Sequence, residues 1–153
     1  MSNLKTEEYL NDLLAKTYDA QRGFANAAEN TNHVQLKRWL ADKGARRTEF
    51  AAQIINEMKG MNQKPEMDGT MKGDMHRSWM NIKTALSLNN DEAILEECIR
   101  GEKAAVDGYQ EVLEHSNELA PTLTQTLKSQ KDEIQMTLSN IRTLEDIADK
   151  HDY

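Results

Sequence analysis

Several features are scarce or missing in this sequence of 153 residues, and each absence excludes a class of protein. The single cysteine, Cys98, rules out an internal disulfide framework and is typical of a reducing compartment. Two prolines and seven glycines are too few for a loop-rich chain. No stretch approaches the roughly 18 continuous apolar residues of a membrane span, and residues 1–14 lack the basic start and apolar run of a signal peptide. We therefore expect a cytoplasmic protein that does not enter a membrane.

Basic residues are also too few to form a concentrated positive face. The chain has 19 Lys and Arg against 26 Asp and Glu, so its formal net charge is −7. No run of lysine or arginine stands out against this balance. Because nucleic acids are bound largely through their phosphates, which need clustered cations, we expect no nucleic-acid partner.

Helix-forming residues dominate the composition that remains. Ala, Glu, Lys, Leu, Gln and Met are abundant, and the length suits one domain with a sizeable core. The pattern predicts a single all-α domain over residues 1–153, with Asn90 capping one helix and Pro121 starting another. The expected helices cover residues about 4–30, 32–60, 70–88, 91–117 and 120–149.

Each of the four long helices carries an apolar stripe that a polar residue interrupts near its middle. In the segment EECIRGEKAAVDGYQEVL, for example, Glu102 stands where a buried apolar residue is expected. The four interrupting residues are Gln21, Arg47, Glu102 and Gln130. They are 26 residues apart in the first pair of helices and 28 in the second, which indicates two similar hairpins joined by a crossover at residues 61–90.

Four segments of the chain resemble a known family: AAEN, RRTEFAAQI, HRSWMNIKTAL and DEAILEECIRGEKAAVDGY. Over roughly residues 5–145 the chain is similar to a bacterial family of ferritin-like bundles of uncharacterised function, distant relatives of the rubrerythrin and bacterioferritin di-iron proteins. The resemblance implies a ferritin-like four-helix bundle, with two helical hairpins joined by a crossover that contains a short fifth helix. It implies no particular activity.

The ligand set of a di-iron centre is incomplete in this sequence. Such a centre takes one glutamate from each of two helices and a Glu-x-x-His from each of the other two. Glu102 occupies a ligand position, but Gln21 and Arg47 stand at two of the others, and no Glu-x-x-His occurs. We interpret Glu102 as the partner of Arg47 in a buried ion pair, with Gln21 and Gln130 completing a hydrogen-bonded polar layer.

A metal site is the alternative interpretation of the same polar residues. If Arg47 turned aside, iron or zinc could be held by Glu102, Glu133, Gln21 and His76. A fixed positive charge at the centre would repel such a dication, so no cofactor is the first expectation. Cys98 lies on the buried stripe without a basic neighbour and is expected to be inert.

Two classes of function therefore follow from the sequence. The first is a non-catalytic interaction or stress-associated module, acting through its surface as a homodimer. The alternative is a ferritin-like metal protein, holding iron or zinc and performing oxidase or peroxide chemistry. The missing ligand set argues against a third role, that of a ferritin-style storage cage.

Overall fold

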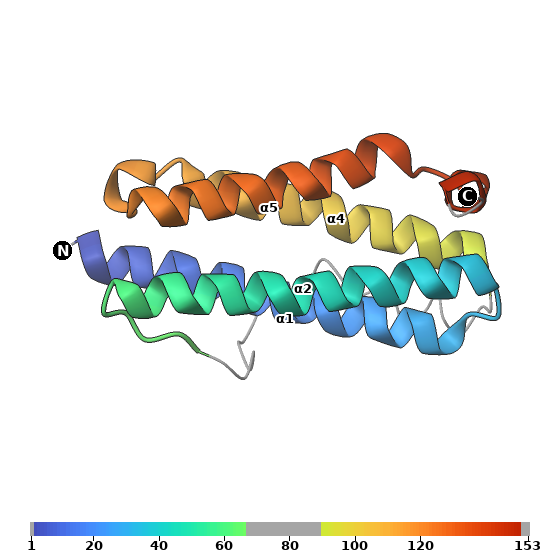
Figure 1. Cartoon of the computed structure of the whole chain (residues 1–153), viewed down its shortest axis with the longest axis horizontal. Helices are drawn as coiled ribbons and strands as arrows, with labels where there is room; N and C mark the ends of the chain where they lie inside the picture. The colour runs from blue at the N-terminus through green and yellow to red at the C-terminus, as the bar shows by residue number, and fades with distance from the viewer. Residues whose placement is uncertain (1, 67–89, 151–153) are drawn as a thin grey trace.

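The computed structural model describes residues 2–66 and 90–150, and within these ranges the regular elements are all helical (Figure 1). This confirms the prediction of an all-α protein. None of the described helices is both long enough and apolar enough to cross a membrane. The short helix expected at residues 70–88, together with His76 and Trp79, lies outside the described residues. The elements are α1 (Ser2–Asn30), α2 (Val34–Gly60), α4 (Asp91–Leu113), η2 (Ser116–Glu118), α5 (Pro121–Asn140) and α6 (Leu144–Lys150).

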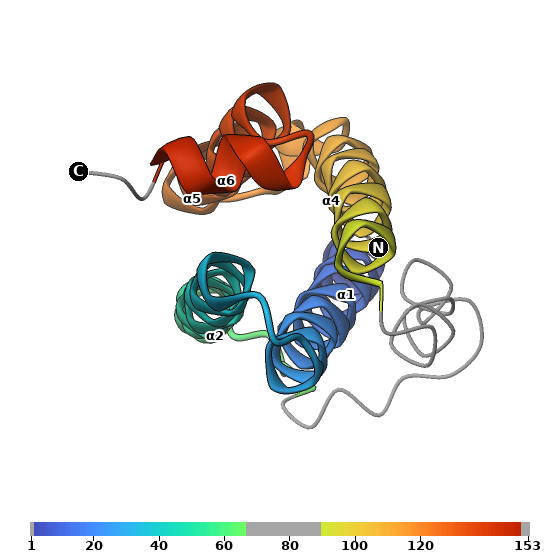
Figure 2. The same ribbon diagram turned by 90° about the vertical axis from the view of Figure 1, so that its right-hand side faces the viewer.

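The four long helices pack as two antiparallel hairpins, α1 with α2 and α4 with α5 (Figures 1 and 2). Seen end-on, α1 lies between α2 and α4, and α5 lies between α4 and α2 (Figure 2). The contacts between α1 and α2 are the most extensive in the described chain, and those between α2 and α5 are fewer. Helix α6 crosses one end of this arrangement, where it packs against α2 and α4.

The buried apolar side chains form two clusters, one at each end of the bundle. The cluster at the α6 end includes Phe24, Trp39, Leu95 and Ile147, and the other includes Phe50 and residues of all four long helices. These side chains come from the apolar stripes of the sequence, whose helical spacing places them on one face of each helix. Of the polar residues that interrupt the stripes, Arg47 and Glu102 lie where the clusters meet.

Several helix ends follow the local signals in the sequence. The Asn90 side chain accepts a hydrogen bond from the Ala93 N–H at 3.1 Å and caps α4. Pro121 stands in the first turn of α5, where its missing N–H costs nothing. Helix α2 begins at Val34, because the Nδ1 atom of His33 accepts a hydrogen bond from the Leu36 N–H at 3.1 Å.

Two helices end earlier than the sequence pattern predicts. Helix α4 was expected to reach residue 117 but ends at Leu113, since the chain tightens into the 3₁₀ turn of η2. The helix expected over 120–149 is broken after Asn140, and α6 begins a new direction at Leu144. A side-chain cap causes this break. Asp146 accepts hydrogen bonds from the backbone N–H groups of Arg142 and Thr143 at 2.8 and 3.1 Å, as the first turn of a new helix requires.

Candidate functional site

The centre of the bundle contains a buried ion pair between Arg47 of α2 and Glu102 of α4. Their side chains are only 3% and 1% exposed, and the Arg47 guanidinium donates a hydrogen bond to Oε1 of Glu102. The guanidinium also lies near the rings of Phe24 and Phe50, 5.6 and 5.4 Å from their centroids. Since these two rings belong to different apolar clusters, the ion pair lies at the boundary between the two halves of the core.

The Glu102 carboxylate has an unusual environment for a charged group. Burial raises its pKa above the ordinary glutamate value, while the positive charges of Arg47 and Lys43 act in the opposite direction. Its second oxygen, Oε2, is buried and makes no hydrogen bond with the described part of the chain. Only one of the two carboxylate oxygens therefore has a hydrogen-bond partner among the described residues. Leaving the other oxygen buried without one costs free energy.

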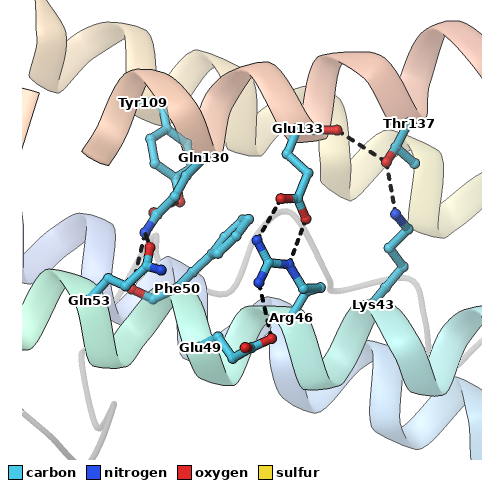
Figure 3. A network of polar contacts seen from close by, with 9 residues as sticks. All are labelled: Lys43, Arg46, Glu49, Phe50, Gln53, Tyr109, Gln130, Glu133 and Thr137. Atoms are coloured by element: carbon cyan, nitrogen blue, oxygen red, sulfur yellow. Dashed lines mark hydrogen bonds and ion pairs between the residues drawn. The ribbon is translucent and has the colours of Figure 1, made fainter. Parts of the chain in front are cut away.

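Gln130 forms a second polar group with Tyr109, Gln53 and the Phe50 backbone (Figure 3). Its Oε1 accepts a hydrogen bond from the Tyr109 hydroxyl at 2.5 Å, and its Nε2 donates to Gln53 Oε1 at 2.8 Å and to the Phe50 carbonyl at 3.3 Å. Tyr109 follows Glu102 by seven residues on α4, which places it about 10 Å farther along the helix. Burial raises the pKa of Tyr109, so its hydroxyl stays protonated.

Gln21 and Glu133 do not join Arg47 and Glu102. Gln21 is half-exposed and donates a hydrogen bond to Thr48 Oγ1 at 3.1 Å. Glu133 forms a two-point ion pair with Arg46, with N–O distances of 2.8 and 2.6 Å (Figure 3). The single polar layer expected from the sequence is therefore divided. Gln21 lies at the edge of the apolar stripe of α1, so its side chain is half-exposed and reaches Thr48 of α2.

Helices α2 and α5 are joined by a line of polar contacts that the sequence analysis missed. We call this line the polar seam. Lys43 Nζ donates to Thr137 Oγ1 at 2.9 Å, and burial lowers the pKa of this lysine. The other links of the seam are Arg46–Glu133, Gln53–Gln130 and Glu57–Thr122. On α2 the residues of the seam are three, seven and four positions apart, so they form a polar stripe beside the apolar one. Figure 3 shows the links of Lys43, Arg46 and Gln53.

The described side chains do not assemble a ligand set for a metal ion. No group of three His, Cys, Asp or Glu side chains converges within residues 2–66 and 90–150. Of the four ligands of the alternative interpretation, Glu102 and Glu133 are each bound by an arginine, and Gln21 faces Thr48. Cys98 is buried near Glu102, and burial raises its thiol pKa, so it stays protonated and inert.

Comparison with known proteins places this sequence in a family. Residues 5–115 match the family described as a domain of unknown function, DUF2383. The matched residues span α1, α2 and α4, and they include both Arg47 and Glu102. No curated protein matches the chain. With most of its length covered by this match, the chain belongs to the DUF2383 family.

Proposed function

We propose that this chain is a non-catalytic, ferritin-like helical module that acts by binding partners through its surface, as a homodimer in the cytoplasm. In this proposal the mid-bundle polar residues are structural. They hold the four helices in register and replace the metal centre of the ferritin-like proteins that the chain resembles.

One observation carries the proposal: each carboxylate that could serve as a central metal ligand is bound by an arginine of α2. Arg47 binds Glu102, and Arg46 binds Glu133 through two parallel hydrogen bonds. Guanidinium groups in these places supply the positive charge that a metal ion would otherwise bring. A dication at the same level would meet a repulsion of several kcal/mol.

A buried pair of this kind contributes to specificity more than to net stability. Removing two charges from water costs nearly as much free energy as their attraction returns. A pair between α2 and α4, however, penalises every other alignment of these helices, because a shifted register would leave a charge buried without its partner. This is the role that we assign to Arg47 and Glu102.

The alternative function is a ferritin-like protein that holds iron or zinc. The observation that favours it is Oε2 of Glu102, which is buried and has no hydrogen-bond partner among the described residues. The described residues do not otherwise fit a metal, and His76 lies outside them. We derive no oxidase or peroxide chemistry from this arrangement.

Metal content distinguishes the two functions. The full chain is purified without a metal-affinity tag, incubated with Fe(II) or Zn(II), desalted and analysed by elemental mass spectrometry beside Glu102→Ala. We expect both proteins to retain only substoichiometric metal. Near-stoichiometric iron or zinc that disappears in Glu102→Ala would overturn the structural role in favour of the alternative. Light scattering on the same samples tests the homodimer.

The structural role also predicts a large stability difference between two glutamates of α4. Glu102→Ala leaves Arg47 charged and buried, so we expect a loss of about 3–5 kcal/mol in the free energy of unfolding, measured with urea. Glu97→Ala is the matched control, since it breaks only the partly exposed pair with Arg100 at 2.8 Å and should cost about 1 kcal/mol or less.

A double variant separates the ion pair from its surroundings. Replacing both charges, as Arg47→Met with Glu102→Leu, removes the uncompensated charge and fills the space with apolar side chains. We expect it to recover most of the stability lost in Glu102→Ala. Equal losses in Glu102→Ala and Glu97→Ala, with no recovery in the double variant, would show that the pair has no structural role.

A further inference from the structure

A joint at one end of the bundle holds the turn between α1 and α2 against the start of α4. Figure 1 shows the end of α1, the start of α2 and the start of α4 together at this end. The hydroxyl of the buried Thr31 donates a hydrogen bond to Asp91 Oδ1 at 2.5 Å, and its oxygen accepts one from the backbone N–H of His33 at 3.1 Å. The joint therefore connects the two hairpins through the residue that caps α2.

His33 caps α2 through a single ring nitrogen. Its Nδ1 accepts a hydrogen bond from the Leu36 N–H at 3.1 Å. Leu36 is the third residue of α2, so its N–H has no helical carbonyl one turn earlier to bind. The backbone bonds of the helix begin one residue later, with the Lys37 N–H and the His33 carbonyl at 2.8 Å. The cap on Leu36 therefore depends on a free lone pair on Nδ1.

Histidine differs from the usual N-cap residues in the way it responds to pH. Ser, Thr and Asn keep their acceptor oxygens at any mild pH. A neutral imidazole has one acceptor nitrogen, whereas both nitrogens of the imidazolium are donors. Histidine is also the side chain whose charge ordinarily changes between pH 5 and 8, and a positive charge at a helix N-terminus is opposed by the helix dipole. Protonation of His33 would therefore turn a stabilising cap into a destabilising group.

The charged groups around the joint do not prevent protonation of His33. The acids in the helix turns at this end are Glu29 of α1, Asp91 and Glu92 of α4, and Glu145 and Asp146 of α6. On α2 the nearest cation along the chain is Lys37, whose Nζ donates to a backbone carbonyl of α1 at 2.8 Å. Within residues 2–66 and 90–150, none of these groups forms an ion pair with His33. The ring is half-buried, so protons can reach it from water.

We propose that His33 is a pH-sensitive cap that releases the first turn of α2 and loosens the joint in mildly acidic solution. A proton from water binds Nδ1, the ring turns away from the Leu36 N–H, and that N–H bonds water. The backbone of His33 then loses its fixed place against Thr31, whose hydroxyl is the link to α4. This device goes beyond the proposed module role and does not depend on it.

The release should remain local because the next residues of α2 are anchored in the core. The Leu36 and Trp39 side chains are buried in the cluster at the α6 end. Val34, the first residue of α2, is 69% exposed and has little packing to lose. Acid should therefore loosen the α1–α2 turn and the first turn of α2 while the four long helices stay folded.

The test is amide hydrogen exchange of the ¹⁵N-labelled full chain, measured by NMR between pH 8 and pH 5. Protection factors are compared, because they remove the intrinsic effect of pH on exchange. We expect the protection of the Leu36 amide to fall about fivefold as His33 is protonated, the effect of losing one side-chain cap. The Thr31 amide, which bonds the Ala27 carbonyl at 3.1 Å, should show a smaller fall as the joint loosens.

His33→Asn separates the cap from its titration. Asparagine offers a side-chain oxygen that caps a helix without taking up a proton in this range, so the Leu36 protection should stay nearly constant. His115→Gln is the matched control, since His115 stacks on Tyr9 at 4.5 Å and does not cap α2. It should behave as the wild type does, and circular dichroism checks that both variants fold.

Three results would overturn the proposal. The first is a Leu36 protection factor that does not change in the wild type between pH 8 and pH 5. The second is an equal fall in His33→Asn, and the third is loss of the fall in His115→Gln. A fall at Leu36 with none at Thr31 would contradict the loosening of the joint.

Discussion

Arg47 shows how a single residue type makes a buried charge tolerable in this core. Its guanidinium is planar, so it lies between the rings of Phe24 and Phe50 while one edge donates to Glu102. A lysine at this position would bring a compact, strongly hydrated ammonium that loses more solvation on burial. The chemistry of the pair therefore depends on arginine and not on positive charge alone.

Gln130 provides the residue-scale prediction. Gln130→Leu removes the acceptor of the buried Tyr109 hydroxyl and the donor to Gln53 without a large change in volume. We expect the free energy of unfolding to fall by about 1–3 kcal/mol in urea titrations, because buried polar groups are left unsatisfied.

Gln125→Leu is the control for this substitution. Gln125 lies on the same helix but is exposed, so its change should stay within about 0.5 kcal/mol. If Gln130→Leu were as neutral as Gln125→Leu, the Tyr109–Gln130 hydrogen bond would make no net contribution to stability.

At the scale of elements, the break between α5 and α6 changes the direction of the chain, so that α6 crosses one end of the bundle. Ile141 and Ile147 both lie in the cluster at the α6 end, which they could not reach together from a straight continuation of α5. The sequence TLED at residues 143–146 is a capping signal of the S/T-x-x-acid kind. The sequence analysis predicted one continuous helix despite this signal, because the apolar stripe continues through Ile141 and Leu144.

Asp146→Ala should loosen α6 while leaving the four long helices folded. Its carboxylate accepts hydrogen bonds from the N–H groups of Arg142 and Thr143, and these bonds hold its pKa below the ordinary value of 3.8. We expect faster amide hydrogen exchange in residues 144–147 and little change in α1. Glu145→Ala, a neighbouring exposed acid in the same turn, is the control.

The same pKa shift sets the pH dependence of this effect. Because the pKa is lowered in the folded state, the stabilisation is complete above the ordinary aspartate pKa and is lost as the pH falls through the lowered value. Amide protection in α6 should therefore differ between wild type and Asp146→Ala at about pH 5, and the difference should shrink as the pH falls below the ordinary aspartate value of 3.8. A difference that does not shrink on acidification would assign the effect to something other than the Asp146 charge.

At the scale of the whole molecule, the two hairpins meet differently along their two lines of contact. Helices α1 and α4 meet mainly through apolar side chains of the core, whereas α2 and α5 carry the polar seam along their length (Figure 3). Polar links of this kind fix alignment but add little stability per contact.

The central link of the polar seam gives the whole-molecule prediction. In a double-mutant cycle with Arg46→Ala and Glu133→Ala, we expect a coupling energy of about 0.5–1 kcal/mol. The side chains are 39% and 38% exposed, so water screens the pair in spite of its two-point geometry. The coupling energy measured at high salt should be smaller still, because salt screens exposed charges.

The comparison for this cycle is Arg46→Ala with Glu49→Ala. Arg46 also contacts Glu49, at 3.0 Å within α2, and this pair does not cross the seam. Its coupling should be smaller, near the few tenths of a kcal/mol that a helix-surface pair contributes. If the two couplings were equal, the Arg46–Glu133 pair would not help to join the hairpins.

The sequence by itself determined that the chain folds as α-helices, which faces of these helices are buried, and that Arg47 and Glu102 interrupt the buried faces. Helical periodicity is a local property, so spacing along the chain is enough to show it. The sequence also predicted the helix starts at Asn90 and Pro121, because a helix start depends on neighbouring residues alone.

Only the tertiary structure decided which polar groups meet. Gln21 and Gln130 have the right spacing for a shared layer, but one faces Thr48 at the surface and the other bonds Tyr109. Whether side chains on different helices meet depends on how the helices are shifted and rotated relative to one another in the bundle. The sequence pattern within one helix does not determine this. For the same reason the sequence could not show that Glu133 meets Arg46 and not Glu102.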